Sequence, residues 1–340
     1  MVRQNRPHDG TQAAVKPPIF IVGPHRSGST LWHNLIAMCP GVMRLTDPRF
    51  LGDRRHKDFN CFLKSCGDLS VDDNVDTMVE MCFSKQNVPG LDSTFWRFEN
   101  IEAVKNPELK KEISNRIKQS DRSLGAIAKI FIEEITRFGG CERACVKFPV
   151  DIRHIPELLQ WFPDCKLVHI TRDPRAVAMS KSNDPSGTAI KITRYPGFAW
   201  FIRRLAMWFV IPQYRWTSRL HLRLKHLPNY RLFRYEDLLA QPEIALRKLC
   251  EFIDVDFTDD LLHPETGRHE HQRSSLTGRQ RKAFDPNAAI RWQRTISVFD
   301  RWLITTLTKG SMKQMGYDPG THPVFQADRR SPSSPRAERA

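Results

Sequence analysis

Short apolar runs rich in β-branched and aromatic residues recur along the chain and predict buried strands. The clearest lie at residues 19–22 (IFIV), 145–148 (CVKF), 166–172 (KLVHITR) and 230–235 (YRLFRY). Their short length and almost continuous apolar character are typical of strands in a parallel sheet, which is buried on both faces.

Segments with apolar residues at helical spacing follow these runs. We expect helices at residues 30–38, 153–162, 174–182 and 242–253. In the last of these, Pro242 suits the first helical turn, and the apolar positions that form one face are Ile244, Leu246, Leu249, Cys250 and Ile253. A long helix is expected over residues 288–308, with an apolar face made by Trp292, Ile296, Phe299 and Leu303.

The alternation of strands and helices predicts an α/β fold, in which helices cover both faces of a central parallel sheet as a three-layer sandwich. We expect one domain over residues 17–319. Residues 52–143 interrupt the alternation with charged, helix-like runs, and we interpret them as a largely helical insertion that helps to bind an acceptor. Residues 1–16 are expected to form a flexible arm, and residues 320–340, rich in Pro, Ser and Arg, a disordered basic tail.

A strongly aromatic, amphipathic segment occupies residues 196–216. One interpretation is a helix that packs on the core. The other is a platform for a membrane surface or for an acceptor. The pattern alone leaves both open.

The net charge of the chain indicates which class of binding partner to expect. It carries 53 Lys and Arg against 38 Asp and Glu, a formal net charge of +15 over 340 residues. Such an excess favours anionic partners. The basic residues are dispersed and no recognised nucleic-acid module occurs, so we expect no specific nucleic-acid binding.

The sequence shows no transmembrane segment or signal peptide. The first residues are polar and lack an apolar core region. The longest uncharged apolar run, near residues 205–214, is about ten residues, whereas a bilayer requires roughly 20. We therefore expect a cytoplasmic protein.

The first predicted strand leads into GPHRSGST, residues 23–30, which is built like a phosphate-binding loop. Gly23 and Gly28 let the backbone turn tightly, so that its N–H groups point inward. The helix that begins near Ser29 adds unsatisfied N–H groups and the positive end of its dipole. The residues expected to hold an anion are Arg26, Ser27, Gly28, Ser29 and Thr30.

The loop departs from that of nucleotide-hydrolysing enzymes, which place a lysine before its final Ser or Thr and an Asp at the end of a nearby strand. Here Ser29 occupies the lysine position, and the strand over residues 166–172 ends in Arg172. The loop therefore predicts a smaller phosphate-like group and no required metal ion. A nucleoside or small-molecule kinase of related fold is the alternative function.

A second motif, RDPRAVAMS, places Arg172 at the carboxyl end of a strand, where open α/β sheets bind their ligands. A helix is expected to begin directly after it, with Asp173 as its cap and Pro174 in its first turn. Ser180 lies about two turns further on, so Arg172 and Ser180 can clamp a dianionic phosphate. An ion pair between Arg172 and a neighbouring carboxylate such as Asp173 is the alternative, and Arg175 is expected to face solvent.

Together with a third motif, RYEDLLAQP at residues 234–242, these segments resemble the sulfotransferases that use 3′-phosphoadenosine-5′-phosphosulfate (PAPS). GPHRSGSTL is similar to the family's 5′-phosphosulfate loop and RDPRAVAMS to its 3′-phosphate segment. The third motif is similar to a stretch whose tyrosine, here Tyr235, lies near the adenine. The resemblance is nearest to the carbohydrate, tyrosylprotein and bacterial branches.

The resemblance implies a fold like that of the P-loop nucleotide enzymes and PAPS as cosubstrate, without a metal. It implies transfer of a sulfuryl group to a hydroxyl or amine of a saccharide, lipid or small metabolite, with adenosine 3′,5′-bisphosphate as the second product. The sequence leaves the acceptor and the oligomeric state open.

The resemblance also implies the catalytic residues. Arg26 and Lys147 are expected to neutralise charge on the leaving phosphate, Lys147 because it resembles a lysine on the family's second strand. The implied base is Asp47, at the position where the carbohydrate and tyrosylprotein branches carry a glutamate. Because aspartate is one methylene shorter, His33 and His56 stay open as alternatives.

Residues 269–282 form a basic stretch at the position where the family often closes over the 3′-phosphate. Its candidates for a cofactor contact are Ser274, Ser275, Arg279 and Lys282. The run HEH at its start lacks further ligands at suitable spacing, so we expect no metal site there.

Overall fold

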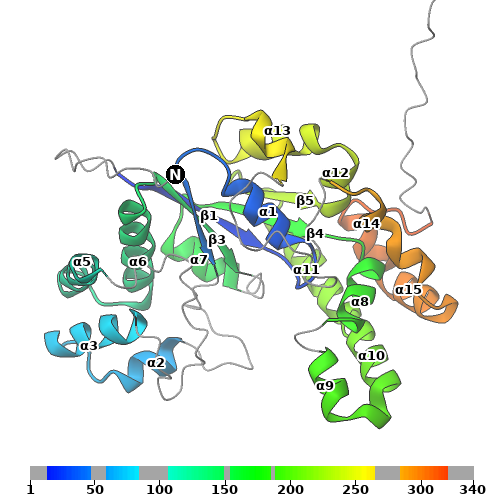
Figure 1. Cartoon of the computed structure of the whole chain (residues 1–340), viewed down its shortest axis with the longest axis horizontal. Helices are drawn as coiled ribbons and strands as arrows, with labels where there is room; N and C mark the ends of the chain where they lie inside the picture. The colour runs from blue at the N-terminus through cyan, green and yellow to red at the C-terminus, as the bar shows by residue number, and fades with distance from the viewer. Residues whose placement is uncertain are drawn as a thin grey trace, which may run out of the picture.

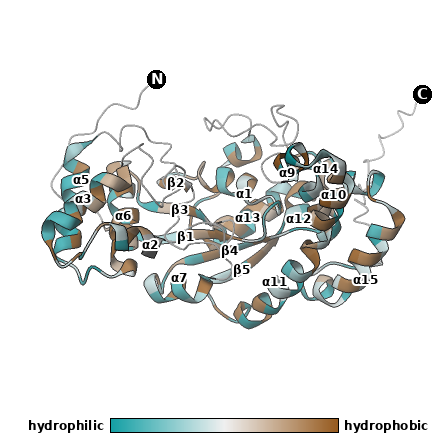
Figure 2. Cartoon of the chain, turned by 90° about the horizontal axis from the view of Figure 1, so that it is seen from below, coloured by the Kyte–Doolittle hydropathy of each residue, from teal (hydrophilic) through white to brown (hydrophobic). Residues whose placement is uncertain are grey.

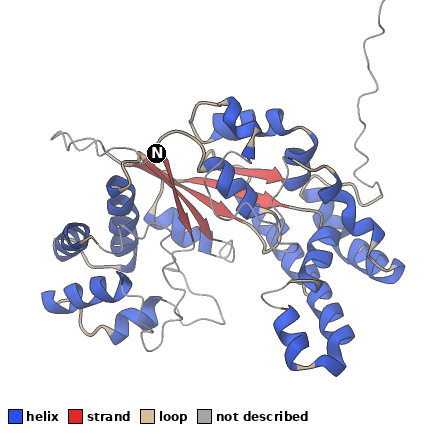
Figure 3. Ribbon diagram, viewed as in Figure 1, coloured by secondary structure: helices blue, strands red, loops and turns tan. Residues whose placement is uncertain are grey.

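Five parallel strands form the central sheet of the protein (Figure 3). The structure, a computed structural model, describes residues 14–46, 59–83, 106–148, 154–184, 188–264 and 284–320. The strands are β1 (Lys16–Val22), β2 (Val42–Thr46), β3 (Arg143–Phe148), β4 (Lys166–Thr171) and β5 (Tyr230–Arg234), in the order β2-β3-β1-β4-β5. β1 is central and pairs with β3 on one side and β4 on the other.

The helices occupy the connections between these strands and the part of the chain after β5 (Figure 1). Those that follow a strand closely are α1 (Ser29–Ile36), α7 (Ile155–Trp161), α8 (Pro174–Ser182), α12 (Tyr235–Ala240) and α13 (Pro242–Phe252). Between β2 and β3 lie α2 (Phe59–Ser65), α3 (Asp72–Phe83), α5 (Pro107–Lys118) and α6 (Leu124–Phe138). Between α8 and β5 lie α9 (Thr188–Arg194), η2 (Pro196–Phe198), α10 (Ala199–Trp208) and α11 (Val210–Leu224). The C-terminal part contains η3 (Asp259–Leu262), α14 (Asn287–Ile290), η5 (Arg291–Arg294) and α15 (Val298–Gln314).

The apolar side chains of β1 divide between the two faces of the sheet. Ile19 and Ile21 join a buried cluster with α1, α12 and α13. Phe20 and Val22 join another cluster with α6 and α7, in which the rings of Phe20 and Phe162 meet edge to face. Each such side chain stabilises the fold by roughly 1.5–3 kcal/mol. Both faces are therefore covered, as Figure 2 shows by the brown strands between the helices, and the predicted three-layer α/β fold is confirmed.

The edge strand β2 is absent from the sequence-based prediction. Its residues, VMRLT, include Arg44 in the middle of the run, so the segment lacks the continuous apolar character of the other strands. β2 is hydrogen-bonded to β3 alone within the described sheet. An edge strand needs less apolar surface than a central one, which explains why the pattern did not reveal it.

The predicted long helix over residues 288–308 is wrong. The chain instead forms α14, the 3-10 turn η5 and, after a break, α15. Ser297 causes the break, because its side chain accepts a hydrogen bond from the N–H of Asp300 and caps the start of α15. The new helix buries Ile304 and Met312 against α8, α10 and α11, while Phe299 is about half exposed.

Two expectations about location and boundaries stay predictions. None of the helices in the described ranges combines the length and the apolar character needed to cross a bilayer. The expected cytoplasmic location is not tested by that finding. Most of the arm and of the tail lies outside the described residues, and the domain limits at residues 17 and 319 stay predictions.

Candidate functional site

The loop between β1 and α1 needs glycine at two positions. Gly23 has a φ of 150°, and a Cβ there would lie 2.3 Å from the carbonyl oxygen of Ile170 in β4. Gly28 has a φ of 94°, and a Cβ there would lie 2.3 Å from the ring of Tyr235. Any side chain at either position would push the loop off the sheet or off Tyr235. The loop is thus held in close contact with β4 and with the start of α12.

The loop ends in a helix whose first turn is open toward the carboxyl edge of the sheet. Gly28 is the N-cap of α1 and provides no side-chain cap, so backbone N–H groups and the positive dipole end face that edge. The hydroxyl of Ser27 is fully buried and has no hydrogen-bond partner among the described residues. An oxyanion could accept hydrogen bonds from these N–H groups and from this hydroxyl, which fits a phosphate or sulfate group.

Arg26 reaches from the loop to the end of α8. Its Nε–H donates to the Ser180 hydroxyl at 3.0 Å, and its Nη1 lies 3.8 Å from the Asp184 carboxylate. The backbone of Arg26 has a φ of 73°, in the left-handed region that ordinary residues rarely adopt. Such a conformation costs on the order of 1 kcal/mol and tends to occur at functional sites.

Arg172 extends from the end of β4 and is fixed by three contacts. Its Nη2 donates to the Ala288 carbonyl at 3.0 Å, and its Nη1 lies 3.5 Å from the Arg26 carbonyl. Its guanidinium stacks on the Tyr235 ring, 4.4 Å from the ring centroid. The Nε of Arg172 is buried without a partner in the described part of the chain. Arg172 thus keeps an N–H donor without a described partner, while its guanidinium is held in place by the other contacts.

The structure brings most of the predicted cofactor residues to one edge of the sheet. Arg172 and Ser180 both contact Arg26, the former at its carbonyl and the latter at its side chain. Tyr235 touches both Gly28 and Arg172. Within the described ranges, Ser27 and Arg172 each keep a buried donor without a hydrogen-bond partner at this edge.

Lys147 approaches the loop from the other side. It lies near the end of β3, beside Ile21 of β1, and it is 9% exposed. Its Nζ is 3.5 Å from the Thr30 hydroxyl, at the start of α1. A positive charge therefore stands beside the first turn of the helix, where a bound anion would be stabilised.

Of the three candidate bases, the structure describes only His33. Asp47 and His56 lie outside the described residues, as does the stretch 269–282. His33 is fully buried on α1, and its Nε2 bonds the Cys145 carbonyl oxygen at 2.9 Å. Because Nε2 must donate its proton to that carbonyl, His33 is engaged in the core.

Arg175 corrects one expectation, because it is buried and does not face solvent. Its guanidinium forks onto Asp173, with a closest approach of 2.7 Å, and stacks on Trp292. Asp173 also caps α8 by accepting from the Arg175 N–H. The alternative in which Asp173 pairs with Arg172 is therefore not the arrangement found, and Arg172 remains turned toward the loop.

The buried carboxyl of Glu236 holds the start of α8 in place through two hydrogen bonds. Glu236 accepts from the Asp173 N–H at 3.0 Å and from the Tyr317 hydroxyl at 2.7 Å. Burial raises the pKa of Glu236 above its ordinary value. These bonds tie α12 and the C-terminal part of the chain to the start of α8, and so fix the direction in which Arg172 leaves β4.

Sequence reasoning missed two partners at this edge. Asp184, which lies near Arg26, comes just beyond the end of α8, where no helical pattern predicts its direction. The Ala288 carbonyl, which holds Arg172, lies 116 positions away in sequence and carries no side-chain signal.

Comparison with known proteins gives the family from the sequence. The sequence model of the sulfotransferase family matches residues 17–259. Carbohydrate sulfotransferase 5 of Mus musculus is 28% identical over 172 residues, 45% of this chain and 41% of the mouse protein. Protein-tyrosine sulfotransferase A of Caenorhabditis elegans is 26% identical over 216 residues, 58% of this chain and 51% of the worm protein. The matched part thus spans about half the length of these curated relatives.

A solved structure agrees in fold. The sulfotransferase domain from the curacin biosynthetic pathway superposes with a TM-score of 0.52 and covers 90% of this chain and 99% of that domain, at 17% identity. The family match covers well over half of the chain and includes the loop, Arg172, Ser180 and Tyr235. The chain belongs to the sulfotransferase family.

Proposed function

We propose that the protein transfers a sulfuryl group from PAPS to a hydroxyl or amine of an acceptor, which is a saccharide, a lipid or a small metabolite. The observation that carries the proposal is the meeting of the β1–α1 loop, Arg172, Ser180 and Tyr235 at one edge of the sheet. This arrangement provides donors for two separate anionic groups and an aromatic ring between them.

Each group has a role in holding the donor. The backbone N–H groups of residues 28–30, with the Ser27 hydroxyl, bind the 5′-phosphosulfate. Arg172 and Ser180 bind the 3′-phosphate, with the guanidinium held flat on Tyr235. Tyr235 lies against the adenine. Arg26 stands between the two anionic ends and contributes charge to both.

The remaining residues act on the reaction itself. The acceptor oxygen or nitrogen attacks sulfur in line, and the bond from sulfur to the bridging phosphate oxygen breaks. Lys147 and Arg26 neutralise the charge that develops on that oxygen. Asp47 accepts the proton that the acceptor loses. The products are the sulfated acceptor and adenosine 3′,5′-bisphosphate, and no metal is required in this scheme.

The kinase alternative is not favoured. Ser29 stands in place of the phosphate-binding lysine, and β4 leads into Arg172 where a magnesium-binding carboxylate would be expected. The family match and the lack of the phosphate-binding lysine in the loop thus both argue against a kinase.

Calorimetry with adenosine 3′,5′-bisphosphate tests the proposal. We expect binding without added magnesium, and loss of most of it in Arg172→Ala. The matched control is Lys248→Ala, an exposed position on α13, which should bind like the unmodified protein. Absence of binding to the bisphosphate, together with magnesium-dependent binding of ATP, would reverse the assignment.

A further inference from the structure

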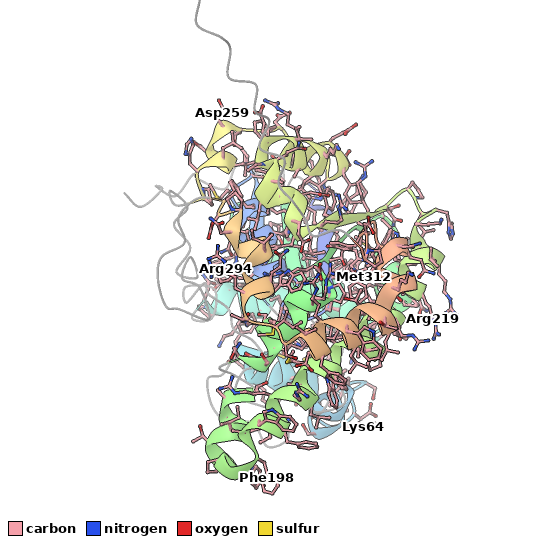
Figure 4. The ribbon with its side chains drawn as sticks, turned by 90° about the vertical axis from the view of Figure 1, so that its right-hand side faces the viewer. Lys64, Phe198, Arg219, Asp259, Arg294 and Met312 are labelled. Carbon is pink, nitrogen blue, oxygen red and sulfur yellow. The ribbon has the colours of Figure 1, made fainter. Side chains whose placement is uncertain are left out.

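Helices α9 and α10 form a projection that leaves the body of the protein away from the sheet (Figure 1). The turn η2 joins them, and Phe198 of that turn marks the outer end of the projection (Figure 4). Here "the tip" denotes residues 188–209. Its large exposed apolar side chains are Ile190, Tyr195, Phe198, Trp200, Phe201, Leu205 and Phe209. Trp200 is 67% exposed and Phe198 66%, so these rings have no cover within the described structure.

Only one side of α10 is used for packing. Met207 is buried in a cluster with residues of α8 and α15. Arg203 bonds the Ser182 carbonyl and the Asn183 amide oxygen at the end of α8. One face of α10 therefore packs on the body, as the first interpretation expects, and the other presents aromatic rings to the outside. The second interpretation, a platform for a membrane surface or an acceptor, stays a prediction.

The apolar surface continues onto α15. The Arg204 guanidinium lies 4.8 Å from the Trp200 ring centroid and 5.5 Å from that of Phe299. It also pairs with Asp300 at 3.1 Å, which holds α10 and α15 together. Phe299 in turn lies beside Trp302, which is 59% exposed. The tip and the start of α15 thus form one continuous aromatic surface.

The tip itself carries charge of a single sign, whereas Asp300 at the start of α15 is paired with Arg204. Residues 185–235 contain no Asp or Glu, and their ten Lys and Arg are Lys191, Arg194, Arg203, Arg204, Arg215, Arg219, Arg223, Lys225, Arg231 and Arg234. Lys191, Arg194 and Arg203 are exposed on the tip itself. The hydrogen-bond partners of Arg203 are neutral, so its charge persists at the surface.

We propose that the tip, with the start of α15, binds the surface of a bilayer that contains anionic lipids. Tryptophan, tyrosine and phenylalanine rings partition into the headgroup region. Cations placed among them attract anionic lipids. A convex projection can insert such rings into a lipid surface without a matching groove, which a protein partner would have to supply. This inference does not depend on the proposed sulfuryl transfer.

Vesicle flotation with the full chain tests it. The two lipid compositions are phosphatidylcholine alone, and phosphatidylcholine mixed with phosphatidylserine. We expect binding to the mixed vesicles that is about tenfold or more tighter than binding to the neutral ones. The double variant Phe198→Ala, Trp200→Ala should lose binding to both by about tenfold or more. Lys191→Glu with Arg194→Glu should remove the preference for the anionic lipid.

Matched controls separate the tip from the general positive charge. Lys111→Glu with Lys129→Glu changes the net charge equally, at exposed sites on α5 and α6, and should leave most binding intact. Phe138→Ala removes an exposed ring on α6 and should have no effect. The basic C-terminal residues are present in every variant, so loss on changing the tip cannot come from them. Circular dichroism and thermal unfolding verify that each variant is folded.

Four results would overturn the proposal. The chain does not float with either vesicle composition, or the ring variant binds as tightly as the unmodified protein. Alternatively, sedimentation shows a concentration-dependent dimer that the ring variant abolishes while vesicle binding stays absent, which would assign the surface to a second copy. Binding to soluble polyglutamate but not to vesicles would assign it to an acidic polymer.

Discussion

Replacement of Arg172 by alanine tests the assignment of the 3′-phosphate position. The guanidinium is held by the Ala288 carbonyl at 3.0 Å and by the Tyr235 ring at 4.4 Å, and its Nε has no partner in the described residues. If a 3′-phosphate accepts from Arg172, the variant loses at least one charge-assisted hydrogen bond at a partly buried position.

The size of the effect follows from these contacts. A hydrogen bond to a charged group contributes about 1.5–3 kcal/mol. At about 1.4 kcal/mol for each tenfold change in affinity, Arg172→Ala should weaken binding of adenosine 3′,5′-bisphosphate by roughly 10- to 150-fold. Arg172→Lys keeps the charge but loses the flat fork that stacks on Tyr235, so its affinity should fall between those of the other two proteins.

Titration calorimetry with two ligands makes the result specific. Adenosine 5′-monophosphate lacks the 3′-phosphate, so its affinity should change by less than about threefold in either variant, well under 1 kcal/mol. Thermal unfolding measures the stability that the lost Tyr235 and Ala288 contacts would remove. Equal weakening of both ligands would show that Arg172 only supports the loop, and unchanged affinity for the bisphosphate would refute the assignment outright.

Three further predictions follow from the same geometry. Gly28→Ala places a Cβ 2.3 Å from the Tyr235 ring, and we expect urea unfolding to show a free energy of unfolding lower by about 1–3 kcal/mol. Gly140→Ala is the control, because a Cβ there meets nothing within 4 Å and the variant carries only the backbone strain. An equal loss of stability in both variants would contradict the described contact. Asp47→Asn should keep its affinity for the bisphosphate and lose turnover by about 10²–10⁴-fold, whereas near-normal turnover would assign the base elsewhere. Burial lowers the pKa of His169 to about 3, below its ordinary value of about 6.5, so the unfolded chain takes up a proton more readily than the folded protein. The free energy of unfolding should therefore fall as pH drops from 6.5 toward 3, by up to about 1.4 kcal/mol per pH unit. An equally steep fall in His169→Gln would refute this origin.

The sequence predicts the centre of this fold well because strong local signals coincide there. Continuous apolar runs mark β1, β3, β4 and β5, and Pro174 with the Asp173 cap sets the start of α8 at the residue expected. The loop is equally clear, since its glycines and hydroxyl residues occur at the spacing that an anion cradle requires. These features depend on neighbouring residues, which a sequence pattern can record.

Features that depend on distant partners escaped the pattern. Arg175 appeared to be an ordinary solvent-facing arginine, yet Trp292, far along the chain, covers it and makes its ion pair with Asp173 a buried one. Ser297 resembles any polar residue in a helix until its hydrogen bond to Asp300 shows that a new helix begins there. β2 was missed because Arg44 interrupts its apolar run. The edge of the sheet tolerates a charged residue there, but a sequence pattern does not show which strand lies at the edge.

Transfer of a radiolabelled sulfuryl group from PAPS, measured across a panel of saccharides, lipids, phenols and tyrosyl peptides with a metal chelator present, tests the central claim most directly. We predict label on at least one class of acceptor, with one adenosine 3′,5′-bisphosphate formed for each group transferred and with little transfer by Arg172→Ala. PAPS left intact by a folded protein that instead consumes ATP with magnesium would contradict the account.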